Sequence, residues 1–156
     1  MRRSASATQD ELHKLKGVLQ IVVRDARTKE FFSRQVLENL VVSGYREQIL
    51  HALTGDDTAN AYINRIEVGT SGVVAAVADT AIVAPTSVAV VASYPAAKQV
   101  RFVGTMGSAE GNGKTFQEAG LVMYSVTLDL VTRRVFAAMA KTADFEWEFT
   151  WTLEWA

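Results

Sequence analysis

The chain has 156 residues, 49% of them hydrophobic, and a formal net charge of −1 at pH 7. This length predicts one domain that buries roughly 70% of the surface its unfolded chain would expose. The near-neutral charge argues against binding to nucleic acid, and the absence of cysteine excludes disulfides and thiolate metal sites. No apolar run reaches the roughly 18 residues of a membrane span, so no membrane partner is expected.

The N-terminal residues 1–16 are small, polar and mixed in charge, which predicts an extended arm. No apolar segment of the kind found in secretory signals follows Arg2 and Arg3, so synthesis in the cytoplasm is expected. A single domain is predicted over residues 17–156. It opens with GVLQIVVRD (17–25) and EFFSRQVLE (30–38), whose alternation on either side of the turn ARTK predicts a β-hairpin.

The middle of the chain holds the one predicted helix. After the short apolar run NLVV (39–42), Ser43 can cap a helix over residues 44–54, and Gly55 can end it. The loop GDDTANA follows.

From residue 62 onward the patterns predict strands. They are YINRIEVG (62–69), two Ala/Val runs on either side of Pro85, KQVRFVGTM (98–106), TFQEAGLVMYSVTLDL (115–130, as one strand or two) and VFAAMAKTA (135–143), with TRR (132–134) as a turn. Many short strands with one helix predict a mainly β fold, a β-sandwich of jelly-roll-like character.

The loop GSAEGNGK (107–114) is the strongest candidate for catalysis, because its end resembles a phosphate-binding P-loop. Gly113, Lys114 and Thr115 fit G-x-x-x-x-G-K-[ST], but Ser108 occupies the place of the first glycine. The residues after Thr115 have a strand pattern, whereas a P-loop must open a helix. A Gly-rich hairpin loop is therefore predicted.

Other catalytic and metal-binding patterns are missing. His13 and His51 are not at metal-ligand spacing, and Asp56 and Asp57 lack the rest of a calcium-loop pattern. The segment GTSG (69–72) is not a G-x-S-x-G nucleophile motif. No catalytic residue, metal or cofactor is predicted, and the chain is not expected to be an enzyme.

The last segment, FEWEFTWTLEWA (145–156), alternates strictly between aromatic and polar residues. Its glutamates and threonines are expected to face water, where acidic side chains protect a sheet from edge-to-edge aggregation. The opposite face is expected either to fill the sandwich core or to form a seam between subunits, because both demand the same alternation. The residues of this face are Phe145, Trp147, Phe149, Trp151 and Trp155.

The order of several segments resembles a family of small structural proteins of tailed bacteriophages. These segments are GVLQIVVRDARTKEFF, ENLVVSGYREQILHALTG, YINRIEVGTSG, DTAI (79–82), FQEAGLVMY, VFAAMAKTADF and EFTWTLEW. In that family a hairpin leads to an NLVV–G–R segment, a short helix, an I–x–I–x–V–G–T strand and a loop with a DT pair. An E–x–G–L strand and a W–T–L–x–W-like strand then close the chain. The resemblance covers residues 17–156 and is weakest over the Ala/Val-rich residues 73–92.

This resemblance implies a binding protein of the virion, with no enzymatic activity. The expected function is a capsid decoration (cement) protein that binds the outer surface of the head, with the major capsid protein and further copies of itself, as a homotrimer, as partners. The arm would reach across capsid subunits or to a neighbouring protomer, through Arg2, Arg3, Leu12 and Leu15. The alternatives are a tail-collar, baseplate or fibre-attachment protein with tail proteins as partners, and a carbohydrate-binding module for host attachment.

Overall fold

The computed structural model describes residues 15–42, 62–124 and 128–155, which form an all-β sandwich. The predicted helix over 44–54 and residues 1–14 of the predicted arm lie outside the described residues. The ten strands are β1 (Leu15–Asp25), β2 (Phe31–Glu38), β3 (Leu40–Val41), β4 (Tyr62–Gly69), β5 (Thr86–Ala89), β6 (Val91–Ser93), β7 (Gln99–Met106), β8 (Thr115–Tyr124), β9 (Leu128–Ala140) and β10 (Phe145–Trp155).

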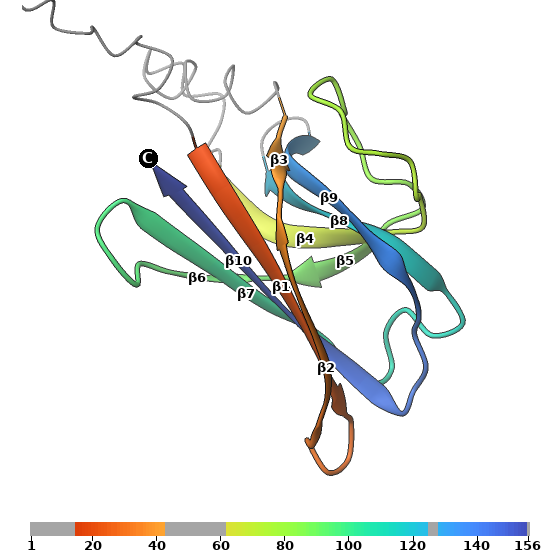
Figure 1. Cartoon of the computed structure of the whole chain (residues 1–156). Helices are drawn as coiled ribbons and strands as arrows, with labels where there is room; N and C mark the ends of the chain where they lie inside the picture. The colour runs from red at the N-terminus through yellow and green to blue at the C-terminus, as the bar shows by residue number, and fades with distance from the viewer. Residues whose placement is uncertain (1–14, 43–61, 125–127, 156) are drawn as a thin grey trace, which may run out of the picture.

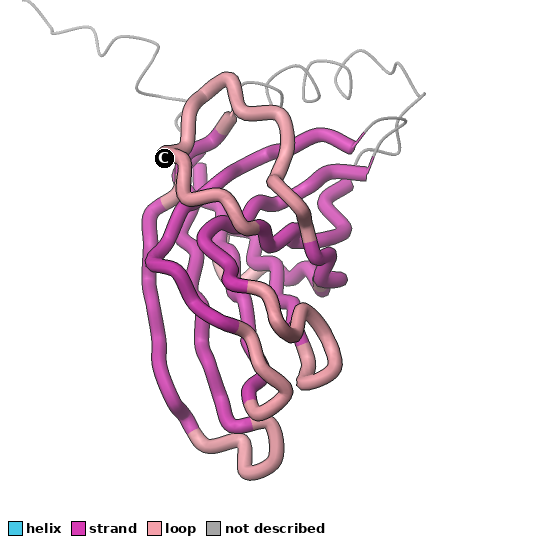
Figure 2. The backbone as a smooth tube through the Cα atoms, turned by 90° about the vertical axis from the view of Figure 1, so that its right-hand side faces the viewer, coloured by secondary structure: helices cyan, strands magenta, loops and turns pink. Residues whose placement is uncertain are grey.

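The strands form two five-stranded antiparallel sheets, which Figures 1 and 2 show from two sides. The first sheet has the order β2-β1-β10-β7-β6, and the second has the order β3-β9-β8-β4-β5. The closing strand β10 lies at the centre of the first sheet. It pairs with β1 over eleven residues, from Leu15 opposite Trp155 to Asp25 opposite Phe145, and with β7 on its other side.

The alternation read from the sequence sets which side chains enter the core. Leu19, Ile21 and Val23 of β1 are buried, and so are the aromatic residues at the centre of β10. They meet Ile66 and Leu121 of the second sheet in one hydrophobic cluster. The residues between them, Gln20 and Val22 in β1 and the glutamates and threonines in β10, turn to the outer face of the first sheet. A mainly β sandwich is therefore confirmed.

At two places the chain passes from one sheet into the other within a single run of strand. Asn39 separates β2 in the first sheet from β3 in the second, and its backbone N–H donates to the Gly17 carbonyl over 3.0 Å. Val90 separates β5 from β6 in the same way, and its N–H donates to the Asn64 carbonyl over 3.3 Å. Such strands that switch sheets are the corners of the sandwich.

Four local expectations are wrong. The Ala/Val run before Pro85 is a loop, and the predicted turn TRR (132–134) lies within β9. The first strand begins at Leu15, two residues inside the predicted arm. The Gly-rich loop 107–114 is not a hairpin loop, because it joins β7 of the first sheet to β8 of the second.

Candidate interaction surfaces

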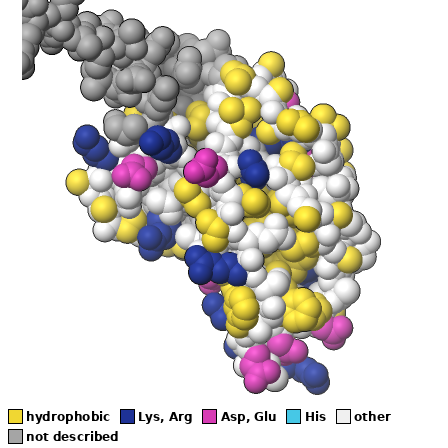
Figure 3. Space-filling view, viewed as in Figure 1, with side chains coloured by type: hydrophobic (Ala, Val, Ile, Leu, Met, Phe, Trp, Pro, Cys, Tyr) yellow, Lys and Arg dark blue, Asp and Glu magenta, His cyan; other side chains and the backbone are white. Residues whose placement is uncertain are grey.

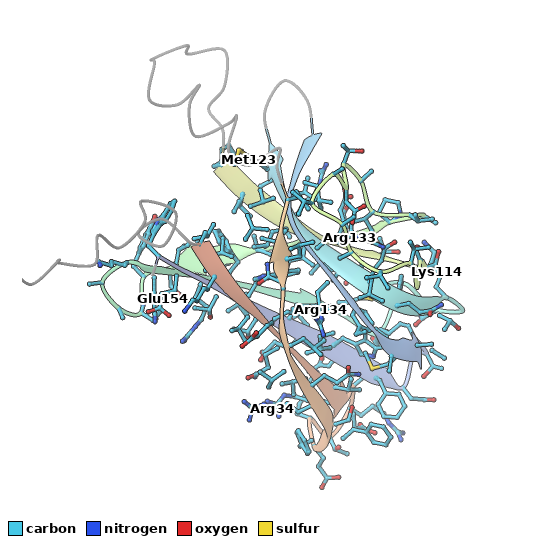
Figure 4. All side chains as sticks on the ribbon, turned by 45° about the horizontal axis from the view of Figure 1, so that its top comes forward. Arg34, Lys114, Met123, Arg133, Arg134 and Glu154 are labelled. Carbon is cyan, nitrogen blue, oxygen red and sulfur yellow. The ribbon has the colours of Figure 1, made fainter. Side chains whose placement is uncertain are left out.

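A buried ionic cluster fixes the loop 70–85 against the outer face of the second sheet. Arg133 of β9 donates from Nε to Glu118 of β8 over 2.6 Å and from a terminal nitrogen to Asp79 of the loop over 2.8 Å. The second terminal nitrogen of Arg133 donates to the Val73 carbonyl over 2.9 Å. Arg133 therefore bonds to the loop twice and to the sheet once. Figure 4 shows Arg133 extending toward this loop.

Glu118 and Asp79 also accept hydrogen bonds from the backbone of the loop. Glu118 Oε1 accepts hydrogen bonds from the N–H groups of Ser71 and Val83, at 3.2 and 2.9 Å. It therefore holds both ends of the loop. Asp79 accepts the Ala76 N–H over 2.7 Å and so closes a tight turn in the middle. The cluster explains why a valine-rich run is a loop here: its backbone groups bond to side chains of β8 and β9.

Two charges of this cluster, those of Arg133 and Asp79, are favoured in their ionised forms. Burial acts to lower the pKa of Arg133, but its hydrogen bonds and charge interactions with Glu118 and Asp79 outweigh burial and raise it. Burial acts to raise the pKa of Asp79, but the Ala76 N–H and the Arg133 guanidinium lower it overall. Every described interaction of Arg133 is directed at the loop or at Glu118, so the role of the cluster is to fix the loop.

The fixed loop presents large apolar side chains to solvent. Val73, Val74, Val77 and Val83 are 71%, 83%, 55% and 54% exposed. In Figure 3, hydrophobic side chains spread over the side of the molecule where this loop lies in Figure 1. Such a cluster of exposed apolar residues on a rigid support marks an interaction surface more often than a single exposed valine would.

A shallow hollow of about 370 Å³ lies beside this loop. Its lining residues are Leu40, Val74, Ala75, Arg133, Arg134 and Val135. The lining is apolar except for the two arginines. Arg133 is occupied by the ionic cluster, whereas the Nε of Arg134 is buried and has no hydrogen-bond partner. We refer to these six residues as the side hollow.

A second exposed apolar surface stands at the turn between β1 and β2. Phe31 and Phe32 are 62% and 65% exposed, and the ring of Phe32 packs on Phe145 with centroids 4.7 Å apart. The turn itself is rigid, because the Asp25 carboxylate accepts the N–H groups of Arg27 and Thr28, both at 2.8 Å. These two bonds lower the pKa of Asp25. We call Phe31 and Phe32 the aromatic tip.

The outer face of the first sheet is a third surface, and no described segment covers it. Its centre is a hollow of about 480 Å³ lined by Val18, Gln20, Arg101, Val103, Glu148, Thr150 and Thr152. The register places Gln20, Thr150 and Val103 side by side across three strands. This face therefore mixes small polar, apolar and charged side chains, and no aromatic side chain lines its hollow.

The Gly-rich loop 107–114 surrounds a buried lysine and leads into a strand. The Nζ of Lys141, which is 1% exposed, donates to the Thr142 carbonyl over 2.9 Å and to Asn112 over 3.3 Å. Burial lowers the pKa of Lys141, and the charge of Glu110 opposes this. The Nζ of Lys114 donates to the Thr86 hydroxyl over 2.9 Å. Strand β8 follows where a P-loop needs a helix, so the loop lacks the helix N-terminus that would bind phosphate.

The residues singled out from the sequence are found in different places. Trp147, Phe149 and Trp151 lie in the core, while Phe145 is partly buried and Trp155 is 39% exposed. These five residues share one face of β10. Arg2, Arg3 and Leu12 lie outside the described residues, and Leu15 opens β1 and packs against the core.

Sequence reasoning missed the aromatic tip and the ionic cluster. The pair Phe31-Phe32 carries a signal, since two adjacent apolar residues in an alternating strand cannot both face the core. The sequence carries almost no signal for the ionic cluster, because its three charged residues come from three separate segments. Arg133 lies in the segment TRR, whose pattern predicts a turn, and Asp79 and Glu118 belong to the DT and E–x–G–L segments.

The described residues hold no group of three or more His, Asp or Glu side chains placed to bind a metal. Within the same residues no helix is long and apolar enough to cross a membrane. No family model, curated protein or solved structure matches the chain.

Proposed function

We propose that this chain is a non-enzymatic structural protein of a bacteriophage virion, a decoration protein that binds the outer surface of the capsid shell. The resemblance of residues 17–156 to small phage structural proteins motivates the assignment, with the major capsid protein and further copies of the chain as partners. A protein that binds only the assembled shell stabilises it, because binding favours the state that is bound.

The observation that best supports a binding function is the contrast between the two outer faces of the sandwich. The loop 70–85 covers the outer face of the second sheet through Ile82, Glu118 and Arg133. No described segment covers the outer face of the first sheet. Its mixture of valine, threonine, glutamine, arginine and glutamate resembles the composition of non-obligate protein interfaces, which are about as polar as the rest of a surface.

The same face disfavours the carbohydrate-binding alternative. Sugar-binding sheets present exposed aromatic rings for stacking, and the seven residues that line the central hollow include none. The tryptophans in the core of β10 are on the inner face of this sheet. A broad, shallow and mixed surface fits a protein partner better than a small ligand.

The first test is to separate heads from tails of the phage that encodes this chain and to measure the protein in each by mass spectrometry. We expect many copies on heads and loss of head stability when they are removed. A few copies on tails would overturn the cement assignment in favour of a collar, baseplate or fibre-attachment protein.

A matched pair of variants then tests the docking face. Thr150→Arg places a long cation at the centre of the open face, and Thr142→Arg places the same side chain in the exposed turn between β9 and β10. We expect Thr150→Arg to weaken binding to stripped heads at least about 10-fold. Thr142→Arg should bind as the wild type does. Equal binding by both variants would exclude this face as the docking surface.

A further inference from the structure

We propose that copies of this chain bind one another head to tail, with the aromatic tip of one copy seated in the side hollow of the next. The inference rests on the self-association in the proposed function, but it does not depend on a location in the virion. The contact uses the aromatic tip and the side hollow, which both lie outside the open outer face of the first sheet.

The side hollow is an apolar site with a fixed wall. Val74 and Ala75 form its loop side, and Leu40 and Val135 form its strand side. Arg133 donates a hydrogen bond to the carbonyl of Val73, the residue before Val74. The loop side of the hollow is therefore held in place by the ionic cluster. An apolar group that enters this hollow would gain burial against a preformed surface, which keeps the entropy cost of binding low.

The aromatic tip has the form of an anchor for such a site. Phe31 and Phe32 are adjacent, mostly exposed, and based on a turn closed by Asp25 and on the ring of Phe145. Large aromatic side chains that enter a pocket carry most of the binding energy at protein interfaces. The side chains of Phe31 and Phe32 are mostly exposed to water, so a partner that covers them would bury additional apolar surface.

One chain cannot bring its own tip to its own hollow. Phe31 begins the strand run β2–β3 and Leu40 lies nine residues later, about 30 Å away at the rise of an extended strand. Figure 1 shows the turn before β2 and the strand β3 at opposite ends of this run. The partner must therefore be a second copy, and the contact is heterologous. Repetition of such a contact closes a ring, as in a trimer, or grows a filament.

Charge complementarity favours this pairing. The carboxylate of Glu30 is exposed immediately before Phe31, and Arg134 in the side hollow has a buried Nε without a hydrogen-bond partner. Figure 4 shows Arg134 close to the strand run β2–β3. With the tip seated, Glu30 of one copy can pair with Arg134 of the next. A guanidinium beside a phenylalanine ring adds a cation–π attraction.

Mixing two variants tests the head-to-tail contact directly. The tip variant carries Phe31→Ser and Phe32→Ser, and the hollow variant carries Val74→Asp; all three positions are exposed, so folding should persist. We expect each variant alone to be monomeric in sedimentation velocity, with self-affinity at least about 30-fold weaker than wild type. An equimolar mixture should form dimers and nothing larger, because only one intact tip and one intact hollow can meet.

A charge exchange tests the pairing of Glu30 with Arg134. Glu30→Arg and Arg134→Glu should each weaken self-association, and the double variant should recover most of it. Val91→Asp on the opposite edge strand β6, where the side chain is 76% exposed, is the control and should assemble as wild type does.

The outcomes separate this inference from the proposed self-association. A wild-type protein that stays monomeric at all concentrations overturns both. An oligomer that survives in both the tip and the hollow variants overturns the contact alone. A variant mixture that remains monomeric also rejects the tip-in-hollow contact, even if each variant has lost assembly by itself.

Discussion

Trp151 shows most directly what the alternation of the last strand does. It stands opposite Leu19 of β1 and Phe102 of β7, and it is fully buried in the core. Its indole Nε1 has no hydrogen-bond partner, so the residue contributes through packing. The sequence left open whether this face belonged to the core or to a subunit seam. The structure shows the central tryptophans between the sheets, because the second sheet lies over them.

Replacing Trp151 by Ala should lower the free energy of unfolding by about 3–5 kcal/mol, since it removes a large side chain that neighbours cannot replace. Trp155→Ala, in the same strand and on the same face, is the matched control. Because Trp155 is 39% exposed, its loss should cost clearly less. Urea denaturation followed by circular dichroism measures both. Equal losses would mean that Trp151 is not a core residue.

At the scale of elements, strands with strict alternation were predictable and the loop 70–85 was not. The segments 62–69, 99–106 and 145–155 are strands because their apolar residues alternate and one face is buried. The run 73–84 is also rich in apolar residues, but its loop backbone bonds to Glu118 of β8 and Arg133 of β9. Those partners lie close only after β8 and β9 have paired. A local pattern therefore cannot reveal them, and the side hollow built on this loop was equally invisible.

The carboxylate of Asp79 should make the attachment of this loop depend on pH. Its pKa in the folded protein lies below the ordinary value of 3.8, so its contribution is present above about pH 4. That contribution is lost as the pH falls through the folded-state pKa. We expect wild type to be more stable than Asp79→Asn at pH 6, and the difference to shrink as the pH falls below about 4 and through the folded-state pKa.

Urea denaturation of both proteins at several pH values measures this difference, and the other carboxyl groups, which the two proteins share, largely cancel. A difference that stays constant from pH 6 to pH 3 would show that the charge of Asp79 does not hold the loop. The ionic pairing with Arg133 would then be a surface contact of little weight.

At the scale of the whole molecule, the two sheets are joined at two corners, Asn39 and Val90. At each corner a single run of strand passes from one sheet into the other. The corner at Val90 lies over Gly104 of β7, and no side chain fits between them. A Cβ atom on Gly104 would lie 2.7 Å from the Ala89 carbonyl oxygen and 2.9 Å from a methyl group of Val88. Gly104 therefore sets how closely the second sheet approaches the first at this corner.

Gly104→Ala should push the β5–β6 corner away and lower the free energy of unfolding by about 1–3 kcal/mol, the range for overpacked cores. Gly107→Ala is the matched control, because a Cβ there would meet only a Glu110 oxygen, at 3.7 Å. That variant should be neutral or slightly stabilising, since alanine restricts the unfolded chain. If Gly104→Ala were also neutral, the corner would have to move freely. The two sheets would then be joined mainly by their core side chains, not by the strand runs that pass between them.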